Sequence, residues 1–164
     1  MASEAVERSR IEELRSMLLE LRKQGELEKR RIEELVGRLD QASRLGCLSL
    51  VAKHAGKKMD KKHGEYRILR LGDVEVWYDT YNGYLEFYRQ GRRVTAGHDR
   101  DSFMQHVLAW ESSIDDLERI VDVVESLPVE LCTLAEILDE AIGLGARELA
   151  EQAARELHIL LGQG

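Results

Sequence analysis

The sequence predicts an α+β fold: an N-terminal coiled-coil-like helix or helical hairpin, a small antiparallel β-meander, and C-terminal acidic helices. Three observations support this prediction. Apolar residues recur in 3-4 heptad spacing from Ile11 onward, which is typical of helices that pack on helices. Over 66–96 the spacing changes to an alternation of apolar and polar residues, with two-residue turn signals between the runs. After Gly97 the helical period returns in an acidic sequence.

The chain has 164 residues, which suits one compact domain or a small domain with an appended coiled coil. We expect a coiled-coil-like helical segment over 1–46, a basic loop over 47–65, and a β-meander plus helical domain over 66–164. The sequence has no long apolar run and no apolar signal core near Met1, so it predicts a cytoplasmic protein that does not enter a membrane.

The two cysteines, Cys47 and Cys132, are far apart in the sequence and belong to no Cys-x-x-Cys pair. Zinc knuckles and disulfide frameworks usually show closer or more numerous cysteines. We therefore expect both residues to be small buried apolar side chains, with no metal bound to them.

Charge is distributed unevenly along the chain, whose net charge is −7. Residues 1–46 carry ten basic and ten acidic residues, 47–97 carry ten basic and six acidic, and 98–164 carry four basic and fifteen acidic. The last stretch would repel a polyanion. It could attract the basic middle stretch, within a protomer or between protomers.

The N-terminal heptad pattern has two apolar halves separated by a weak centre. Their apolar residues are Ile11, Leu14, Leu18 and Leu21, then Ile32, Leu35, Leu39 and Ala42. Gly25 and Glu28 occupy the seam positions between the halves and would pack poorly in a coiled-coil core. The sequence Arg-Ile-Glu-Glu-Leu at 10–14 recurs 21 residues later, at 31–35, which indicates an internal repeat.

Two arrangements explain this pattern. Gly25 either ends one helix and starts a hairpin, or lies inside one helix of about forty residues, roughly 60 Å long. Both arrangements leave an apolar stripe that needs another helix as cover. We therefore expect a homo-oligomer, with a dimer favoured, that self-associates through Ile11, Leu14, Leu18, Leu21, Ile32, Leu35 and Leu39.

Turn signals divide the alternating region into strands expected over 66–71, 74–81, 84–89 and 92–96. Asn82-Gly83 is a preferred pair for a type I′ hairpin, because both central residues need positive φ. Gly72-Asp73 suits a type II′ turn, and Gln90-Gly91 marks a third turn. With two-residue turns, the core face collects Leu69, Leu71, Val74, Val76, Tyr78, Leu85, Phe87 and Val94.

The other sheet face combines aromatic and charged residues. With the same turns it collects Tyr66, Ile68, Arg70, Glu75, Trp77, Asp79, Tyr81, Tyr84, Glu86, Tyr88 and Arg93. Arg70 is expected opposite Glu75, and Trp77 opposite Tyr88. Aromatic rings can stack on nucleic-acid bases, but the carboxylates would repel phosphate. We therefore expect Trp77, Tyr81, Tyr84 and Tyr88 to form an interface covered by helices or by a protein partner.

Between the first helices and the sheet, basic residues cluster within eighteen positions. Their side chains could contact phosphates: Lys53, Lys57, Lys58, Lys61, Lys62, Arg67 and Arg70. Such a cluster could bind nucleic acid without reading its sequence. The alternative is a solvated loop, which we prefer because no known nucleic-acid-binding signature accompanies the charge.

The acidic C-terminal region predicts a series of helices. Phe103, Val107 and Trp110 share one helical stripe, which we expect to pack on the aromatic face of the sheet. Ser113 suits the N-cap of a helix that begins at Ile114. Further helices are expected over 129–142 and 146–161.

One local group of acid-base residues, His98, Asp101 and His106, lies where the sheet leads into the next helix. Their spacing does not suit metal ligation on a helix, and we expect Asp101 to cap that helix. The sequence lacks a phosphate-binding glycine loop, a nucleophile elbow and a zinc-protease motif. It therefore predicts no enzymatic activity, no catalytic residues and no cofactor. The expected function is an oligomerising scaffold or adaptor that binds a protein partner, with nucleic-acid association as the alternative.

Overall fold

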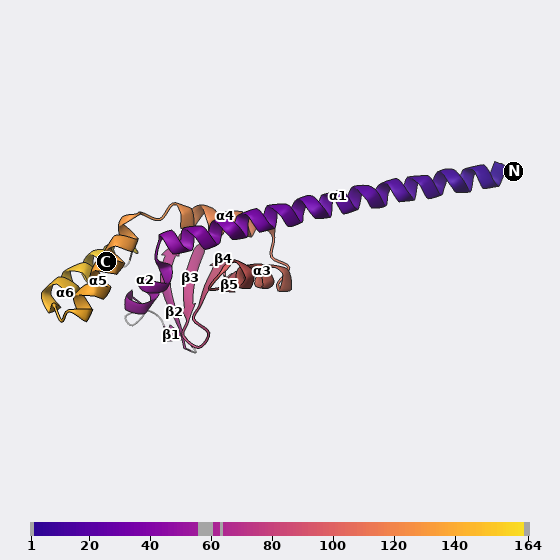
Figure 1. The fold of residues 1–164 in the computed structure, drawn as a ribbon. Helices are drawn as coiled ribbons and strands as arrows, with labels where there is room; N and C mark the ends of the chain where they lie inside the picture. Colours follow the sequence, from indigo (N-terminus) through magenta and orange to yellow (C-terminus); the bar gives the residue numbers. More distant parts are fainter. Residues whose placement is uncertain (1, 56–60, 63, 163–164) are drawn as a thin grey trace.

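The computed structural model describes residues 2–55, 61–62 and 64–162, and it confirms the α+β fold (Figure 1). A long helix is followed by an antiparallel sheet and then by further helices. The elements are α1 (Ala2–Leu45), α2 (Leu48–Ala55), β1 (Lys61–Lys62), β2 (Glu65–Leu71), β3 (Val74–Asp79), β4 (Tyr84–Arg89), β5 (Arg92–Gly97), α3 (Arg100–Ala109), α4 (Ile114–Glu125), α5 (Glu130–Gly143) and α6 (Arg147–Leu160).

The N-terminal segment is one continuous helix of 44 residues, so the hairpin alternative is wrong. Gly25 does not interrupt α1, because a glycine inside a helix costs only about 1 kcal/mol relative to alanine. Its neighbours from Leu21 to Glu28 are mostly good helix formers. At about 1.5 Å per residue the helix is roughly 65 Å long. Its N-terminal half projects away from the rest of the molecule (Figure 1).

The sheet is antiparallel with strand order β1-β2-β3-β4-β5, and its four longer strands match the predicted ones closely. Leu71 pairs with Val74 across the two-residue turn that begins with Gly72, as predicted. Gln90 and Gly91 both have positive φ, of 51° and 76°. The type I′ turn is therefore formed by Gln90-Gly91 and not by Asn82-Gly83.

The expected two-residue turn at Asn82-Gly83 is wrong. Asp79 pairs with Tyr84, which leaves a four-residue loop over 80–83. The Asp79 carboxylate accepts hydrogen bonds from the Tyr81 backbone N–H at 2.9 Å and from the Asn82 side chain at 2.8 Å, and these bonds stabilise the longer loop. The register between β3 and β4 moves by two residues, so the residues of these two strands keep their predicted faces.

The buried face of the sheet packs on helices. Its fully buried residues include Val74, Val76, Phe87 and Val94, and helices α1 to α4 contribute to the same apolar core. Ile68, predicted on the other face, is also buried, because a bulge in β2 between Arg67 and Leu69 turns two successive residues inward. Leu71, predicted in the core, is 37 % exposed.

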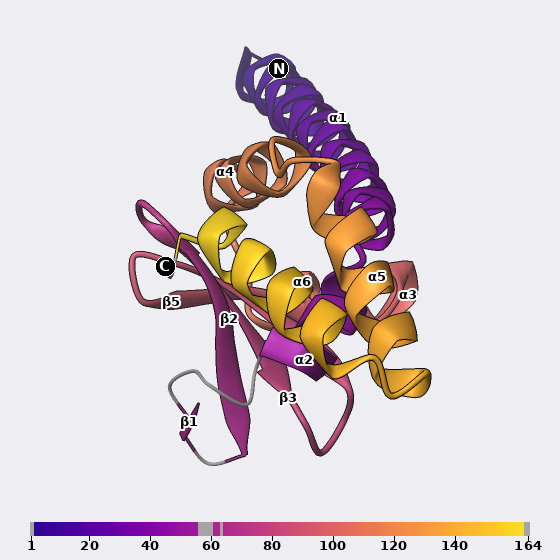
Figure 2. The same ribbon diagram turned by 90° about the vertical axis from the view of Figure 1, so that its left-hand side faces the viewer.

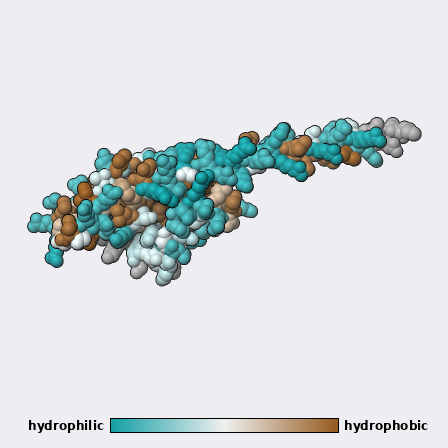
Figure 3. Space-filling view, viewed as in Figure 1, coloured by the Kyte–Doolittle hydropathy of each residue, from teal (hydrophilic) through white to brown (hydrophobic). Residues whose placement is uncertain are grey.

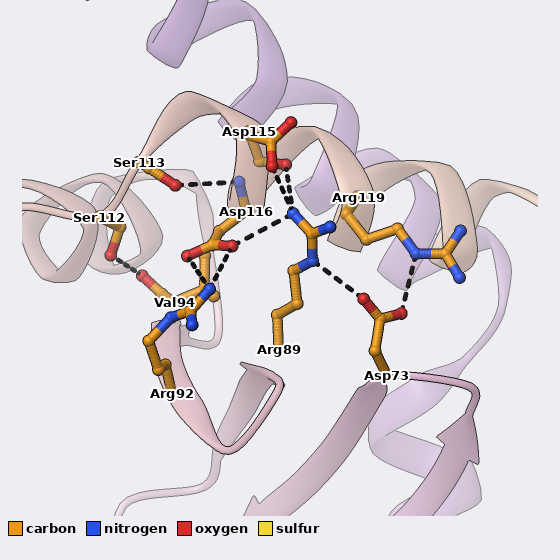
Figure 4. A network of polar contacts seen from close by, with 9 residues as sticks. All are labelled: Asp73, Arg89, Arg92, Val94, Ser112, Ser113, Asp115, Asp116 and Arg119. Carbon is orange, nitrogen blue, oxygen red and sulfur yellow. Dashed lines mark hydrogen bonds and ion pairs between the residues drawn. The ribbon is translucent and has the colours of Figure 1, made fainter.

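A network of ion pairs connects α4 to the turns of the sheet (Figure 4). The Arg89 guanidinium donates to Asp73 at 3.0 Å, and Arg119 of α4 donates to the same carboxylate at 3.0 Å. These two guanidinium groups hold the pKa of the Asp73 carboxyl below its usual value. Arg92 donates to Asp116 at 2.9 Å. The network sets the position of α4 over the sheet.

Two helix starts test the capping predictions. Ser113 caps α4 as predicted, since its hydroxyl accepts from the Asp116 N–H at 3.1 Å. The N-cap of α3 is Asp99, so the expected cap at Asp101 is wrong. The Asp99 carboxylate accepts from the Ser102 N–H at 2.9 Å, and the Ser102 hydroxyl accepts in return from the Asp99 N–H at 3.2 Å.

A disulfide joins Cys47, between α1 and α2, to Cys132 of α5, 85 residues later. The expectation of two separate buried thiols is therefore wrong. Both cysteines are half-buried. The 47–65 segment, expected as a basic loop, also contains α2, whose residues Leu48 and Val51 are buried because they follow a helical spacing.

Candidate functional site

The N-terminal half of α1 exposes the first half of the heptad stripe. We call residues 7–30 the arm; every one of them is exposed. The seam residues Ile11, Leu14, Leu18 and Leu21 are 46–64 % exposed. Figure 3 shows hydrophobic residues along this projecting part of the molecule. An exposed apolar stripe on a long helix is typical of helices that bind another helix.

The second half of the same stripe packs inside the molecule. We call residues 31–45 the covered half of α1. Leu35 and Leu39 are buried there and Ile32 is half-buried. Helix α4 lies beside this half in both views of the ribbon (Figures 1 and 2). It contributes its own buried stripe, whose residues are Leu117, Ile120, Val121 and Val124.

Two ion pairs fix the register between the covered half and α4. Arg31 donates to Glu118 at 3.1 Å, and the Arg38 Nε donates to Glu125 at 3.0 Å. The second pair lies seven residues after the first in both helices, so α1 and α4 run parallel. Arg38 also holds the pKa of the Glu125 carboxyl below its usual value. The contact is a parallel pairing of two helices along their apolar stripes.

The seven residues predicted for self-association are therefore divided by the fold. Ile32, Leu35 and Leu39 are covered by the chain's own helices and are not available to a second chain. Ile11, Leu14, Leu18 and Leu21 remain on the surface. The sequence did not distinguish the two groups, because both follow the same heptad spacing.

The predicted aromatic interface is only partly exposed. Trp77, Tyr84 and Tyr88 are half-buried, whereas Tyr81 is 82 % exposed in the 80–83 loop and does not lie in a strand. Trp77 faces Glu86 across the strands, so its predicted pairing with Tyr88 is wrong. The two rings still meet diagonally, edge to face, with centroids 6.4 Å apart.

Helix α3 covers the aromatic face less than predicted. Phe103 packs on Phe87 in the core, with ring centroids 5.7 Å apart, and Val107 is buried in the same core. Trp110 instead lies under the Arg93 guanidinium, 5.4 Å from the ring centroid. The predicted stripe therefore divides between the core and the edge of the outer face.

The two histidines singled out by the sequence come together around Tyr84. The Tyr84 ring stacks on His98 at 5.3 Å and meets His106 edge to face at 5.8 Å. His106 Nδ1 donates to the Ser102 carbonyl at 2.8 Å, because a carbonyl can only accept. Asp101 is exposed. The group thus forms an aromatic cluster at the start of α3.

Glu86 is the buried carboxyl of the outer face, with only 6 % of the residue exposed. Burial, together with the nearby Glu65 carboxyl, raises the pKa of Glu86 to about 7. The Tyr88 hydroxyl donates to Glu86 at 3.3 Å. The charge of this face therefore changes near neutral pH, a feature that strand alternation alone does not indicate.

The basic residues proposed as phosphate contacts do not form one free patch in the described structure. Lys53 pairs with Asp139 at 3.2 Å, and Arg67 and Arg70 lie 3.5 and 3.9 Å from Glu75. Part of their charge is thus neutralised within the chain. Lys61 and Lys62 form β1. Lys57 and Lys58 lie outside the described residues.

The cysteine pair has an acidic neighbour that the sequence did not indicate. The two sulfur atoms and a Glu136 carboxylate oxygen lie within 4.8 Å of one another. In the reduced state two thiolates and a carboxylate are ligands that Zn²⁺ accepts. The disulfide seen here occupies the sulfur atoms, so the arrangement acts as a cross-link between α5 and the α1–α2 connection.

Comparisons of the chain with family models, with curated proteins and with solved structures find no match. Within the described ranges, no helix combines the length and the apolar character that a membrane span requires. The candidate site therefore rests on the geometry of α1.

Proposed function

We propose that this protein is a non-enzymatic oligomerising scaffold or adaptor, whose arm associates with a helix of another protein chain. One observation carries the proposal: a single heptad stripe is packed on α4 in the covered half of α1 and is bare along the arm. The covered half demonstrates that the stripe suits a helical partner. The arm offers the same surface without one.

Burying the apolar stripe of the arm against a second helix is energetically favourable. Fully burying an apolar side chain of the size of leucine contributes about 1.5–3 kcal/mol, and the arm carries four of them in register. An isolated helix obtains none of this gain. No residue of the arm is buried in the free chain, so this gain is still available to it.

The test compares two aspartate substitutions on the arm. Leu14→Asp places a charge in the seam and is expected to abolish association. Leu19→Asp is the matched control, since Leu19 is equally exposed, at 50 %, but lies outside the seam. Light scattering and partner capture with the full chain give the readout. The proposal fails if the unsubstituted chain neither self-associates nor binds a helix, or if both variants behave alike.

The homodimer predicted from the sequence is one form that this association could take, and the same light-scattering measurement distinguishes it from association with a different helix. The prediction of a cytoplasmic location is tested by counting free thiols in protein taken from cells. Disulfides are rare in the reducing cytosol. A Cys47–Cys132 bond present in such protein would count against a cytoplasmic location.

A further inference from the structure

We infer that the helix bound by the arm is an amphipathic helix with acidic residues bordering its apolar seam. This inference rests on the proposed function and names the chemistry of the partner. Two observations carry it: the charges that border the seam of the arm, and the contact that α1 already makes with α4.

The charges along the arm are sorted by heptad position. Ile11 and Leu18 take position a, and Leu14 and Leu21 take position d, because the apolar spacing alternates between three and four. Positions e and g border the seam. Within the arm they are occupied by Arg8, Arg10, Arg15, Met17, Arg22, Gln24 and Lys29. Five of these seven residues are cationic and none is acidic.

The acidic residues of the arm lie elsewhere. Those at the outer positions b and c are Glu12, Glu13, Glu20 and Glu26, and two more, Glu7 and Glu28, lie in the seam beyond its apolar section. The arm is therefore not uniformly charged. It presents an apolar strip with a cationic border at position e and a mixed border at position g, which holds Arg10, Met17 and Gln24, and its carboxylates face away from any helix that packs on the apolar strip.

The covered half shows which helix suits such borders. Arg31 and Arg38 take position g in the same heptad assignment. They pair with Glu118 and Glu125, which border the apolar stripe of α4 and are one heptad apart. Helix α4, which packs on this seam within the chain, therefore has an apolar stripe that is bordered by acidic residues. In the arm the cations lie mainly on the opposite border of the seam, at position e, where every residue is Arg or Lys.

A second copy of the arm fits this surface poorly. In a parallel pair, position g of one helix faces position e of the next heptad in the other, so Arg10 would face Arg15 of the second copy. In an antiparallel pair, like positions face each other, and the cations at e would again meet cations. Repulsion at close range opposes the antiparallel pair along position e and the parallel pair at the Arg10–Arg15 contacts, and neither arrangement gives the border cations a carboxylate. A helix with Glu or Asp at e and g converts the same contacts into ion pairs.

The experiment uses the full chain and two synthetic peptides of about four heptads with Ile at a and Leu at d. The acidic peptide carries Glu at e and g, and the basic peptide carries Lys there. Binding is measured by fluorescence anisotropy at low and at physiological salt. We expect the acidic peptide to bind at least about tenfold more tightly, the ratio that about 1.4 kcal/mol produces. The preference should weaken as salt rises.

A charge-altered chain, Arg15→Glu with Arg22→Glu, should lose most of its preference for the acidic peptide, because two carboxylates then stand among the three remaining border cations. Equal affinity for both peptides, an unchanged preference after the reversal, or a homodimer that excludes the acidic peptide would overturn the inference. Leu14→Asp separates this outcome from failure of the proposed function. If that variant binds the acidic peptide as well as the unsubstituted chain does, the seam itself is not the binding surface, and both proposals are wrong.

Discussion

The arm and the covered half of α1 have the same pattern and opposite surroundings. Leu18 and Leu39 both occupy position a of the heptad, yet the first is 46 % exposed and the second is fully buried. The difference arises because α4 packs in parallel on the covered half of α1 and leaves the arm exposed. A heptad pattern thus indicates that a helix requires cover, but it does not indicate whether the cover comes from the same chain.

The largest expected effect comes from truncating one residue in each half. Leu39→Ala should lower the free energy of unfolding by about 2–5 kcal/mol, because it leaves a cavity between α1 and the core. Leu18→Ala should change it by less than about 0.5 kcal/mol, because that side chain is in solvent. Urea unfolding of dilute protein without a partner measures both. Equal losses would mean that the arm is packed in the free chain.

A second prediction concerns the cross-link at the end of the covered half. Cys132→Ser should destabilise the oxidised protein by about 2–4 kcal/mol, because the disulfide restricts a long loop of the unfolded chain. With excess dithiothreitol, the unsubstituted chain and the variant should unfold at similar urea concentrations. A difference that persists after complete reduction would assign the loss to packing around the sulfur atom.

A third prediction follows from the raised pKa of Glu86, and it concerns the sheet face opposite the helices. The unfolded chain releases this proton near the ordinary value of 4.5 and the folded chain near 7, so between these values the folded state binds more protons. The contribution of Glu86 to stability therefore falls as the pH rises from about 4.5 to 7. Glu86→Gln should remove this decline and raise the melting temperature at pH 8.

The matching measurement is thermal unfolding at several pH values between 4.5 and 8. Asp79→Asn serves as a comparison on the same face, since this half-buried carboxylate at the end of β3 accepts hydrogen bonds from Tyr81 and Asn82. Identical pH profiles for the Glu86→Gln variant and the unsubstituted chain would show that the carboxyl titrates normally in the folded protein.

A fourth prediction tests the register between α1 and α4. Arg38→Glu should destabilise the chain by roughly 0.5–1 kcal/mol, since both members of its ion pair are partly exposed. Adding Glu125→Arg should restore most of the loss, because the pair is re-formed with reversed charges. A double-mutant cycle in low and high salt gives the coupling. Absence of coupling would contradict the parallel register on which the choice of an acidic partner depends.

The smallest expected effect concerns nucleic acid. Any binding by the Lys53–Arg70 segment should be weak, independent of sequence, and steeply reduced by salt, as counterion release requires. The arm should not contribute, so the Leu14→Asp variant should bind like the unsubstituted chain. Sequence-specific binding that persists in high salt would instead favour nucleic-acid association as the function.

The local patterns of the sequence determined the α+β class, the approximate bounds of the four longer strands and the Ser113 cap. These features depend on residues close in the chain: apolar spacing decides which faces need burial, and glycine positions such as Gly72 and Gly91 mark turns that require positive φ. The continuous α1 was one of two open alternatives, since the cost of Gly25 alone is too small to decide between them.

Only the tertiary structure decided which surfaces were covered and by what. The pairing of Arg31 and Arg38 with α4, the cross-link between Cys47 and Cys132, and the burial of Glu86 join residues that the sequence alone does not place together. Each depends on how whole elements pack, and packing is governed by the total apolar area and charge brought together. The heptad spacing therefore predicts that Leu14 and Leu35 both belong to a stripe that packs on another helix. The position of α4 determines that only Leu35 is buried within the chain.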